Sequence, residues 1–322
     1  MRFAVRIGFV IGLGGLIVLI AREGVREILD LLLRGGWALL LLVPLHALPL
    51  LLDARGWQEL VRARSRLGVL FFIACIREAV GRLLPTAGLG GEIVGIRLLV
   101  RQRVDGTVAA ASVIVELTVT LTAQFLFAVL GVLCVLRLTD AVGWTSELVL
   151  GLAASALLLG VFFALLRNGA VFGRLERVAG HLFGLNSRGA SELWRGAHLD
   201  TAIRDLLAAH RRLLRALFWQ LAGLLVGCSE TWLALRWLGH PVGIPAALAL
   251  ESSTQAARHV FFLVPAGLGV QEAGLIGVTH LLGIGTDVAI ALSLAKRMRE
   301  LAFSLPQLIA WQWIEGRAAL SR

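Results

Sequence analysis

The sequence predicts an all-α integral membrane protein with about six transmembrane helices and two re-entrant helical hairpins in an inverted-topology internal repeat. Three observations support this fold class. Of the 322 residues 58% are hydrophobic and only 16% charged, apolar runs of membrane-spanning length recur, and one Pro–Gly–Glu motif occurs twice. Because so few charged residues cannot cover the surface of a soluble protein of this size, lipid must solvate much of the exterior. We assign residues 1–322 to one membrane domain, with repeat one over 36–136, a basic amphipathic cytoplasmic segment over 167–215 and repeat two over 216–314.

The spans follow from apolar runs of about 20 residues, the length that crosses a bilayer as a helix. The first run, with two arginines before it, resembles a secretory signal, but we expect it to be retained because Leu19 occupies a position where cleavage needs a small residue. Pro44 and Pro49 predict a bend in the second span. The predicted spans cover residues 7–21, 36–53, 106–136, 148–166, 216–238 and about 286–314.

Two stretches, 67–101 and 245–283, are each broken near the middle by proline and glycine. Their legs are marginal in length for a span and, in the first stretch, too charged to face lipid, so we expect helical hairpins that enter the membrane and return to the same side. The spacing of Gly91 and Gly95 favours close helix packing. The residues that break the two hairpins are Pro85, Gly88, Gly90, Gly91, Pro265, Gly267 and Gly269.

The hairpin motifs are related by a constant offset in the numbering. Pro85-Thr-Ala-Gly-Leu-Gly-Gly-Glu92 recurs as Pro265-Ala-Gly-Leu-Gly-Val-Gln-Glu272, and Trp57 matches Trp237 at the same offset. Three predicted spans lie between the hairpins, and an odd number of crossings makes the hairpins enter from opposite sides. Inverted repeats with broken helices are the architecture of secondary transporters.

The charge distribution predicts the orientation and the partners. The net charge is +10, and arginines concentrate in residues 53–66 and 167–215, so we expect both of these segments and both termini to be cytoplasmic. Arginine between apolar spans favours membrane lipids as partners, including anionic phospholipids, over nucleic acid. Self-association as a homodimer is left open. The three cysteines lie in apolar stretches and predict neither disulfides nor a metal site, and no cofactor motif is found.

Ionisable residues at membrane depth are functional candidates because each costs free energy unless it is paired. Glu92 and Glu272 are related by the repeat and could contact a lipid headgroup or a coupling proton. Alternatively, each caps the N-terminus of its own hairpin leg. Arg77, Arg82, Arg97 and Arg258 could bind a lipid phosphate by paired hydrogen bonds. Alternatively, these arginines form internal ion pairs with Glu78, Glu92 and Glu251.

Glu116 and Lys296 also occupy equivalent positions at the offset of the repeat. Opposite charges at two-fold-related sites could meet near the pseudo-axis, so we expect a salt bridge between them, in a structural or a coupling role.

Several stretches resemble a known family. Arg77-Glu-Ala-Val-Gly-Arg-Leu-Leu-Pro-Thr-Ala-Gly-Leu-Gly-Gly-Glu92 resembles the flippase-like domain in the membrane half of lysylphosphatidylglycerol synthases. The chain is more similar to HpnL-type membrane proteins associated with hopanoid biosynthesis. Further stretches that carry this resemblance are His46-Ala-Leu-Pro-Leu-Leu-Leu-Asp53, Ser229-Glu-Thr-Trp-Leu-Ala-Leu235, Gly239-His-Pro241, Ala291-Leu-Ser-Leu-Ala-Lys-Arg297 and Trp311-Gln312.

The resemblance implies a multi-pass protein of the bacterial inner membrane that acts on a hopanoid or a related lipid. It does not imply synthase activity, because the resemblance is to the membrane half of those synthases, whereas their aminoacyl-transferase half is a separate soluble domain at the C-terminus. We expect lipid translocation or binding without catalysis. The alternatives are a membrane-embedded enzyme that modifies a lipid headgroup and a non-catalytic scaffold of a lipid-biosynthesis complex.

Overall fold

The computed structural model describes residue 30 and residues 33–61, 65–84, 90–139, 145–168, 196–260 and 270–320. Regular structure in these ranges is helical throughout, which confirms the predicted fold class. The predicted span at 7–21 lies outside the described residues, as do the hairpin breaks Pro85, Gly88, Pro265, Gly267 and Gly269. The helices are η1 (Gly36–Leu41), α3 (Leu42–Leu45), α4 (Ala47–Leu60), α5 (Leu67–Leu83), α6 (Gly90–Arg101), α7 (Gly106–Leu138), α8 (Thr145–Asn168), α11 (Gly196–Ala208), α12 (His210–Trp237), α13 (Ile244–Val260), α14 (Val270–Leu281) and α15 (Thr286–Leu320).

Four of the described helical stretches are long and apolar enough to cross a membrane: Leu33–Leu60, Gly106–Leu138, Val149–Arg167 and His210–Trp237. They correspond to four of the predicted spans. The fourth differs at its start, because α12 begins at His210 and takes in residues that we predicted to belong to the basic surface segment. Arginine side chains near a helix end can reach the headgroup layer, so the membrane helix continues through residues whose low hydropathy indicates a surface segment. α15 has the length of a span, but charged side chains between Lys296 and Glu300 interrupt its apolar sequence.

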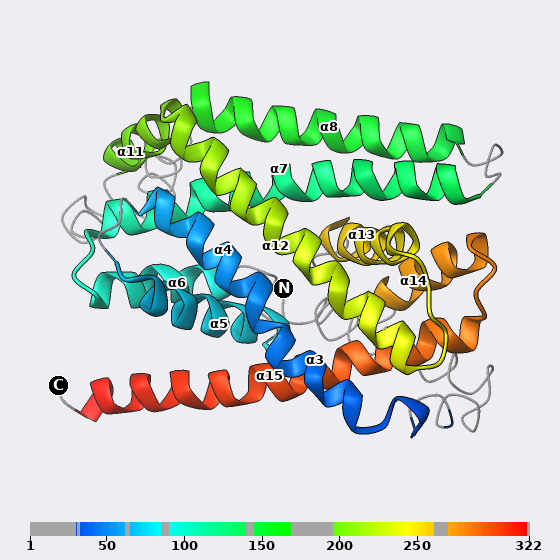
Figure 1. The fold of residues 1–322 in the computed structure, drawn as a ribbon. Helices are drawn as coiled ribbons and strands as arrows, with labels where there is room; N and C mark the ends of the chain where they lie inside the picture. The colour runs from blue at the N-terminus through cyan, green and yellow to red at the C-terminus, as the bar shows by residue number, and fades with distance from the viewer. Residues whose placement is uncertain are drawn as a thin grey trace, which may run out of the picture.

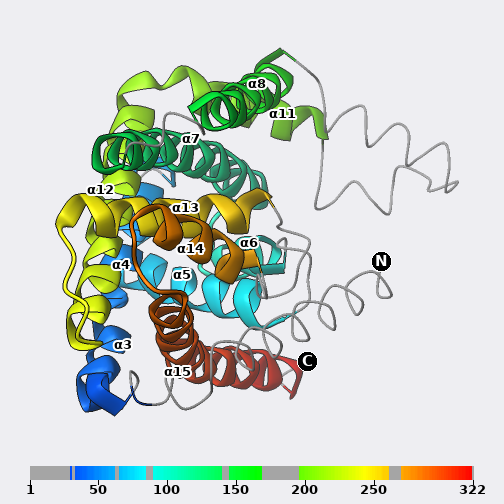
Figure 2. The ribbon, with the colours of Figure 1, turned by 90° about the vertical axis from the view of Figure 1, so that its right-hand side faces the viewer.

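The two hairpins form the centre of the molecule. Helices α5 and α6 pack against each other, as do α13 and α14, while α7 and α15 lie on either side of them and α4 and α12 cover a third side (Figure 2). In Figure 1 the open ends of the α5–α6 hairpin lie at the left and those of the α13–α14 hairpin at the right. The two hairpins therefore enter the bundle from opposite ends.

The backbone repeats itself at the offset that relates the two sequence motifs. Helix α6 covers residues 90–101 and α14 covers residues 270–281. The starts of the helices that follow them, α7 at 106 and α15 at 286, are separated by the same number of residues. The turns between these helices share a left-handed residue, with φ of 62° at Arg103 and 67° at Gly283. The amide of Val104 donates to the carbonyl of Leu99 at 3.3 Å, and the equivalent amide of Ile284 donates to Thr279 at 2.8 Å.

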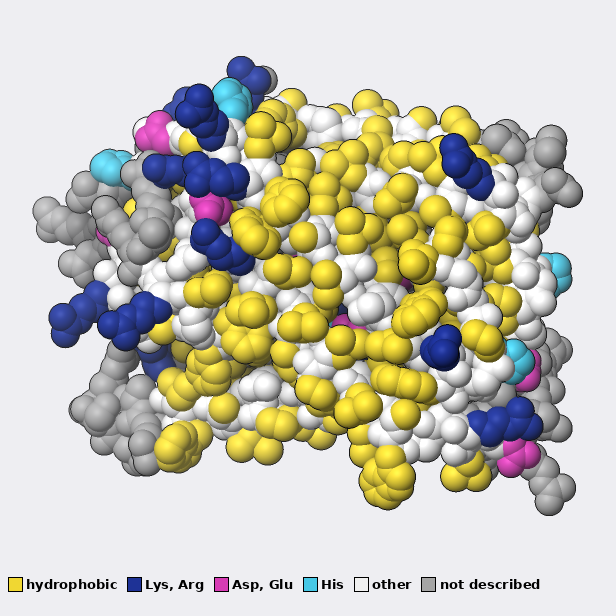
Figure 3. All heavy atoms as spheres, viewed as in Figure 1, with side chains coloured by type: hydrophobic (Ala, Val, Ile, Leu, Met, Phe, Trp, Pro, Cys, Tyr) yellow, Lys and Arg dark blue, Asp and Glu magenta, His cyan; other side chains and the backbone are white. Residues whose placement is uncertain are grey.

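Apolar side chains cover most of the face shown in Figure 3, and arginines gather at its left and right edges. Helix α8 lies at the edge of the bundle against α7 and α11 (Figure 1), and leucines along it are largely exposed, including Leu150 and Leu158. An exposed apolar belt between charged ends is what a lipid-solvated surface requires.

Small residues allow the helices around the hairpins to pack closely. A Cβ added at Gly91 would lie 2.4 Å from the carbonyl oxygen of Arg77, and one at Gly95 would lie 2.6 Å from the Arg77 side chain, which confirms the predicted close packing here. A Cβ at Gly131 on α7 would lie 1.7 Å from the Ser252 hydroxyl on α13. The two legs of the first hairpin are therefore packed tightly together, and the second hairpin lies tightly against α7.

Candidate functional site: a buried charge cluster

The interior of the bundle contains a connected set of charged side chains, which we call the central charge cluster. It joins repeat one to repeat two, because its members come from α5, α12, α13, α14 and α15 and from the break between α3 and α4. The cluster contains four glutamates, four arginines and one histidine: His46, Glu78, Arg82, Glu230, Arg258, Glu272, Arg297, Arg299 and Glu300. With His46 neutral the formal charges of the cluster sum to zero.

His46 lies where the second span is broken, between α3 and α4. Its Nε2 is 3.0 and 3.1 Å from the two carboxylate oxygens of Glu78, and its Nδ1 is 2.8 Å from Oε1 of Glu230. The guanidinium of Arg299 also contacts Nδ1, and the ring meets Phe303 edge-on with 5.1 Å between centroids. The imidazole thus contacts three charged groups from three helices.

Glu300 links the rest of the cluster. Its carboxylate accepts hydrogen bonds from Arg258 at 3.0 and 3.1 Å and forms an ion pair with Arg82 at 3.3 Å. Arg297, one turn earlier on α15, lies 3.9 Å from Glu300 and donates to Glu272 at 3.2 Å. Repeat one and repeat two are therefore joined by an ion pair at Arg82 as well as by the contacts of His46.

A second group, the Arg77 triad, lies within repeat one. Arg77 donates to Glu92 on α6 and, at 2.6 Å, to Glu116 on α7. Its guanidinium lies over the ring of Trp57, 4.5 Å from the centroid, a cation–π contact. Trp57 in turn donates its indole N–H to Ser112 at 3.3 Å. The triad ties both hairpin legs to α4 and α7.

The third group is the pair of Lys296 and Glu251 within repeat two. The carboxylate of Glu251 accepts hydrogen bonds from Lys296, from Thr231 and, at 3.0 Å, from Gln255. The predicted salt bridge between Glu116 and Lys296 is therefore wrong, because each residue pairs with a hairpin helix of its own repeat. The equivalent positions face their local partners rather than the pseudo-axis.

Most of the residues predicted from sequence lie in these three groups. Of the two readings of the arginines, internal ion pairing is observed for three: Arg77 pairs with Glu92, Arg82 with Glu78, and Arg258 with Glu300. Arg97 is exposed on α6, and Gly90 and Gly91 form the first turn of that helix.

Glu92 and Glu272 both bond side chains of other helices, which is more than a cap of their own leg would do. Glu92 accepts from Arg77, while Glu272 accepts from Ser293 at 2.7 Å and from Arg297. Glu272 is 1% exposed. Both carboxylates therefore hold a hairpin leg to charged or polar groups in the interior.

Most members of the central charge cluster were not among the predicted site residues. Their signal was available, because each is an ionisable residue inside a predicted span or hairpin. Hydropathy gives depth in the membrane but not the direction in which a side chain points. The clustering follows only from the packing of α12 and α15 against α3, α4 and α5. The missed residues are His46, Glu78, Glu230, Arg297, Arg299 and Glu300.

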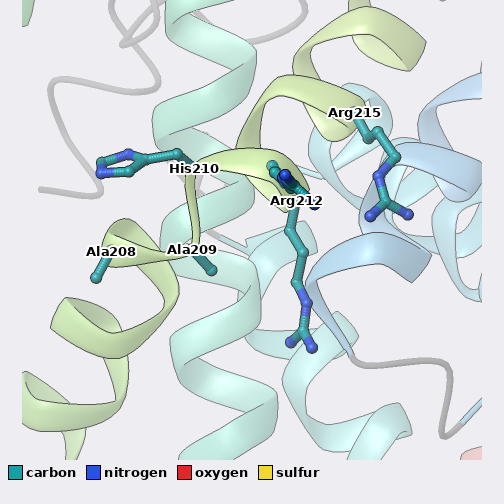
Figure 4. Close-up of a pocket in the computed structure, with 6 residues that line it drawn as sticks. Ala208, Ala209, His210, Arg212 and Arg215 are labelled. Atoms are coloured by element: carbon teal, nitrogen blue, oxygen red, sulfur yellow. The ribbon is translucent and has the colours of Figure 1, made fainter.

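A different basic site lies at the elbow between α11 and α12. A hollow of about 440 Å³ is lined by Ala208, Ala209, His210, Arg211, Arg212 and Arg215. Figure 4 shows Arg212 and Arg215 extending toward the same side while His210 points away from them. Arg215 also forms an ion pair with Glu59 at 3.1 Å, and Leu214 and Phe218 beside it are exposed. Cations next to exposed apolar residues are typical of the headgroup layer.

The sequence matches the family described as Lysylphosphatidylglycerol synthase TM region over residues 5–306, and the chain belongs to this family. No curated protein and no solved structure matches it. Together with the apolar helices, the family identifies a multi-pass membrane protein with a membrane lipid-related function.

Proposed function

We propose that this member of the lysylphosphatidylglycerol synthase TM-region family moves a lipid between the leaflets of the bacterial inner membrane without modifying it. The observation that carries the proposal is the central charge cluster, which lies inside an apolar shell and connects both repeats. Each unpaired charge at the bilayer centre costs about 2.5–3.5 kcal/mol on the insertion scale. So many buried charges therefore indicate a functional path for a polar headgroup.

The architecture supports an alternating-access route. The coincident bounds of α6 with α14, and the hairpin ends at opposite sides, are what an inverted repeat produces. In such folds the substrate binds near the midplane where the repeats meet. A headgroup entering there would replace a carboxylate on an arginine of the cluster, so that one ion pair is exchanged for another.

The substrate proposed from the resemblance to HpnL-type proteins is a hopanoid or a related lipid. Anionic phospholipids are proposed as further partners at the α11–α12 elbow, where Arg212 and Arg215 extend together beside exposed Phe218. This assignment makes the elbow the cytoplasmic end of the molecule by the positive-inside rule.

The test uses Glu92→Gln and Glu272→Gln in the full chain, reconstituted into vesicles with headgroup-labelled lipids. Glutamine still accepts hydrogen bonds but removes the charge, so both variants should insert normally and move lipid roughly tenfold more slowly or worse, about 1.4 kcal/mol in the barrier. Asp105→Asn, an exposed N-cap of α7 outside the three buried groups and the elbow, is the control, because asparagine removes the charge and still caps the helix. Full activity in the double variant would leave both carboxylates with a structural role.

The same vesicles separate transport from catalysis. Mass spectrometry of the recovered lipid should show an unchanged molecule. A modified headgroup would instead favour the membrane-enzyme alternative.

A further inference from the structure

His46 has more contacts than one protonation state can satisfy. A carboxylate only accepts hydrogen bonds and a guanidinium only donates them. Nε2 faces the two oxygens of Glu78 and must carry a proton in order to bond them. Nδ1 faces both a carboxylate oxygen of Glu230 and a guanidinium nitrogen of Arg299, and it can bond only one of them at a time.

One proton decides between the two bonds. When Nδ1 is bare, it accepts from Arg299, and Glu230 keeps its own ion pair with Arg299 at 3.4 Å. When Nδ1 is protonated, it donates to Glu230, and the imidazolium repels the guanidinium. The proton adds to the Nδ1 lone pair from water and leaves by the same bond, so no other bond forms or breaks.

We propose that His46 is the proton-binding site that couples the movement of lipid to the proton gradient. The inference rests on the function proposed above. Protonation changes the hydrogen-bond partner of Nδ1 from Arg299 to Glu230. His46 belongs to repeat one (36–136) and both partners belong to repeat two (216–314), so this bond connects the two repeats. It therefore changes which contacts hold the repeats together.

The surroundings of the ring favour such an exchange. The break between α3 and α4 places the imidazole beside α5, α12 and α15. Phe303 packs edge-on against it and limits its rotation, so the proton state changes the partner and not the position of the ring. The other titratable and charged groups nearby are Asp53 on α4, Cys75 and Arg82 on α5, and Glu300 on α15.

The experiment measures lipid movement in vesicles with an inward, an outward or no pH gradient. Wild-type protein should respond to the gradient. His46→Gln should move lipid at a rate independent of it, because glutamine can donate to Glu78 and accept from Arg299 but cannot take up the proton. His240→Gln, an exposed histidine beyond α12, should respond like the wild type. A gradient response that survives His46→Gln would overturn the proposal.

A second measurement does not depend on transport. Nitrogen-15 NMR of the detergent-purified wild-type protein should show one histidine whose Nδ1 gains a proton as the pH falls, together with a shift of one arginine Nε–H signal. Arg299→Gln should abolish that arginine shift. If the wild type moves no lipid but this titration is present, the proposed transport function is wrong and the proton-binding site at His46 is supported. If the histidine and arginine signals do not change together, the proposed proton-binding site is wrong.

Discussion

Replacing Lys296 with Met tests the local pairing of the buried charges. Methionine keeps an apolar stem of similar length but strands Glu251, whose side chain is 9% exposed. Thr231 and Gln255 would still donate to that carboxylate, but neither neutralises it. Removing one partner of a buried pair costs about 3–5 kcal/mol, because the remaining charge is left uncompensated. Adding Glu251→Gln removes that charge, so the double variant should be more stable than Lys296→Met alone.

The measurement is the free energy of unfolding in mixed micelles, followed by tryptophan fluorescence while a denaturing detergent is added. The Lys296–Glu251 cycle should give a coupling energy of about 0.5–3 kcal/mol, as expected for residues in contact. A matched cycle of Lys296→Met with Glu116→Gln should be additive within about 0.5 kcal/mol, because the two residues share no partner. Coupling in the second cycle and additivity in the first would refute the local pairing.

Two further predictions concern packing and topology. Gly131→Ala should destabilise the protein by about 1–3 kcal/mol, because the methyl group would overlap a side chain of α13, whereas Gly160→Ala, with open space around it, should stabilise it by about 0.5–1 kcal/mol in the same unfolding assay. The topology is tested with single cysteines in a background without native cysteines. Cysteines at Gly243 and Gly285 should react with a membrane-impermeant reagent added from the periplasm, and a cysteine at Arg103 should react only from the cytoplasm. Periplasmic labelling at Arg103 alone would contradict the inverted topology.

The positions of the helices could be predicted from sequence where apolarity or the repeat provided the signal. The hairpin at 67–101 was found from its proline and glycine break, and the constant offset of the repeat related it to the second hairpin. The start of α12 was missed because Arg211, Arg212 and Arg215 depress hydropathy at a helix end from which their side chains can reach the headgroups.

The ion pairs inside the bundle could not be predicted from sequence for a different reason. Glu116 and Lys296 share a position in the repeat, but each points toward the hairpin of its own half, and this direction depends on how α7 and α15 are rotated about their axes. His46 was not among the predicted site residues, because a lone histidine in an apolar run does not indicate which groups it contacts. Only the approach of α12 and α15 gives it charged neighbours from the second repeat.

The charges of α15 also have a consequence for biogenesis. The translocon releases a helix into lipid according to its own hydrophobicity, and Lys296, Arg297, Arg299 and Glu300 together oppose that release by about 10 kcal/mol. The free-energy cost of burying those charges is offset only beside α5, α12, α13 and α14, whose side chains form ion pairs with them. Helix α15 must therefore enter the membrane together with helices made earlier, so its integration is a step of folding and not of insertion alone.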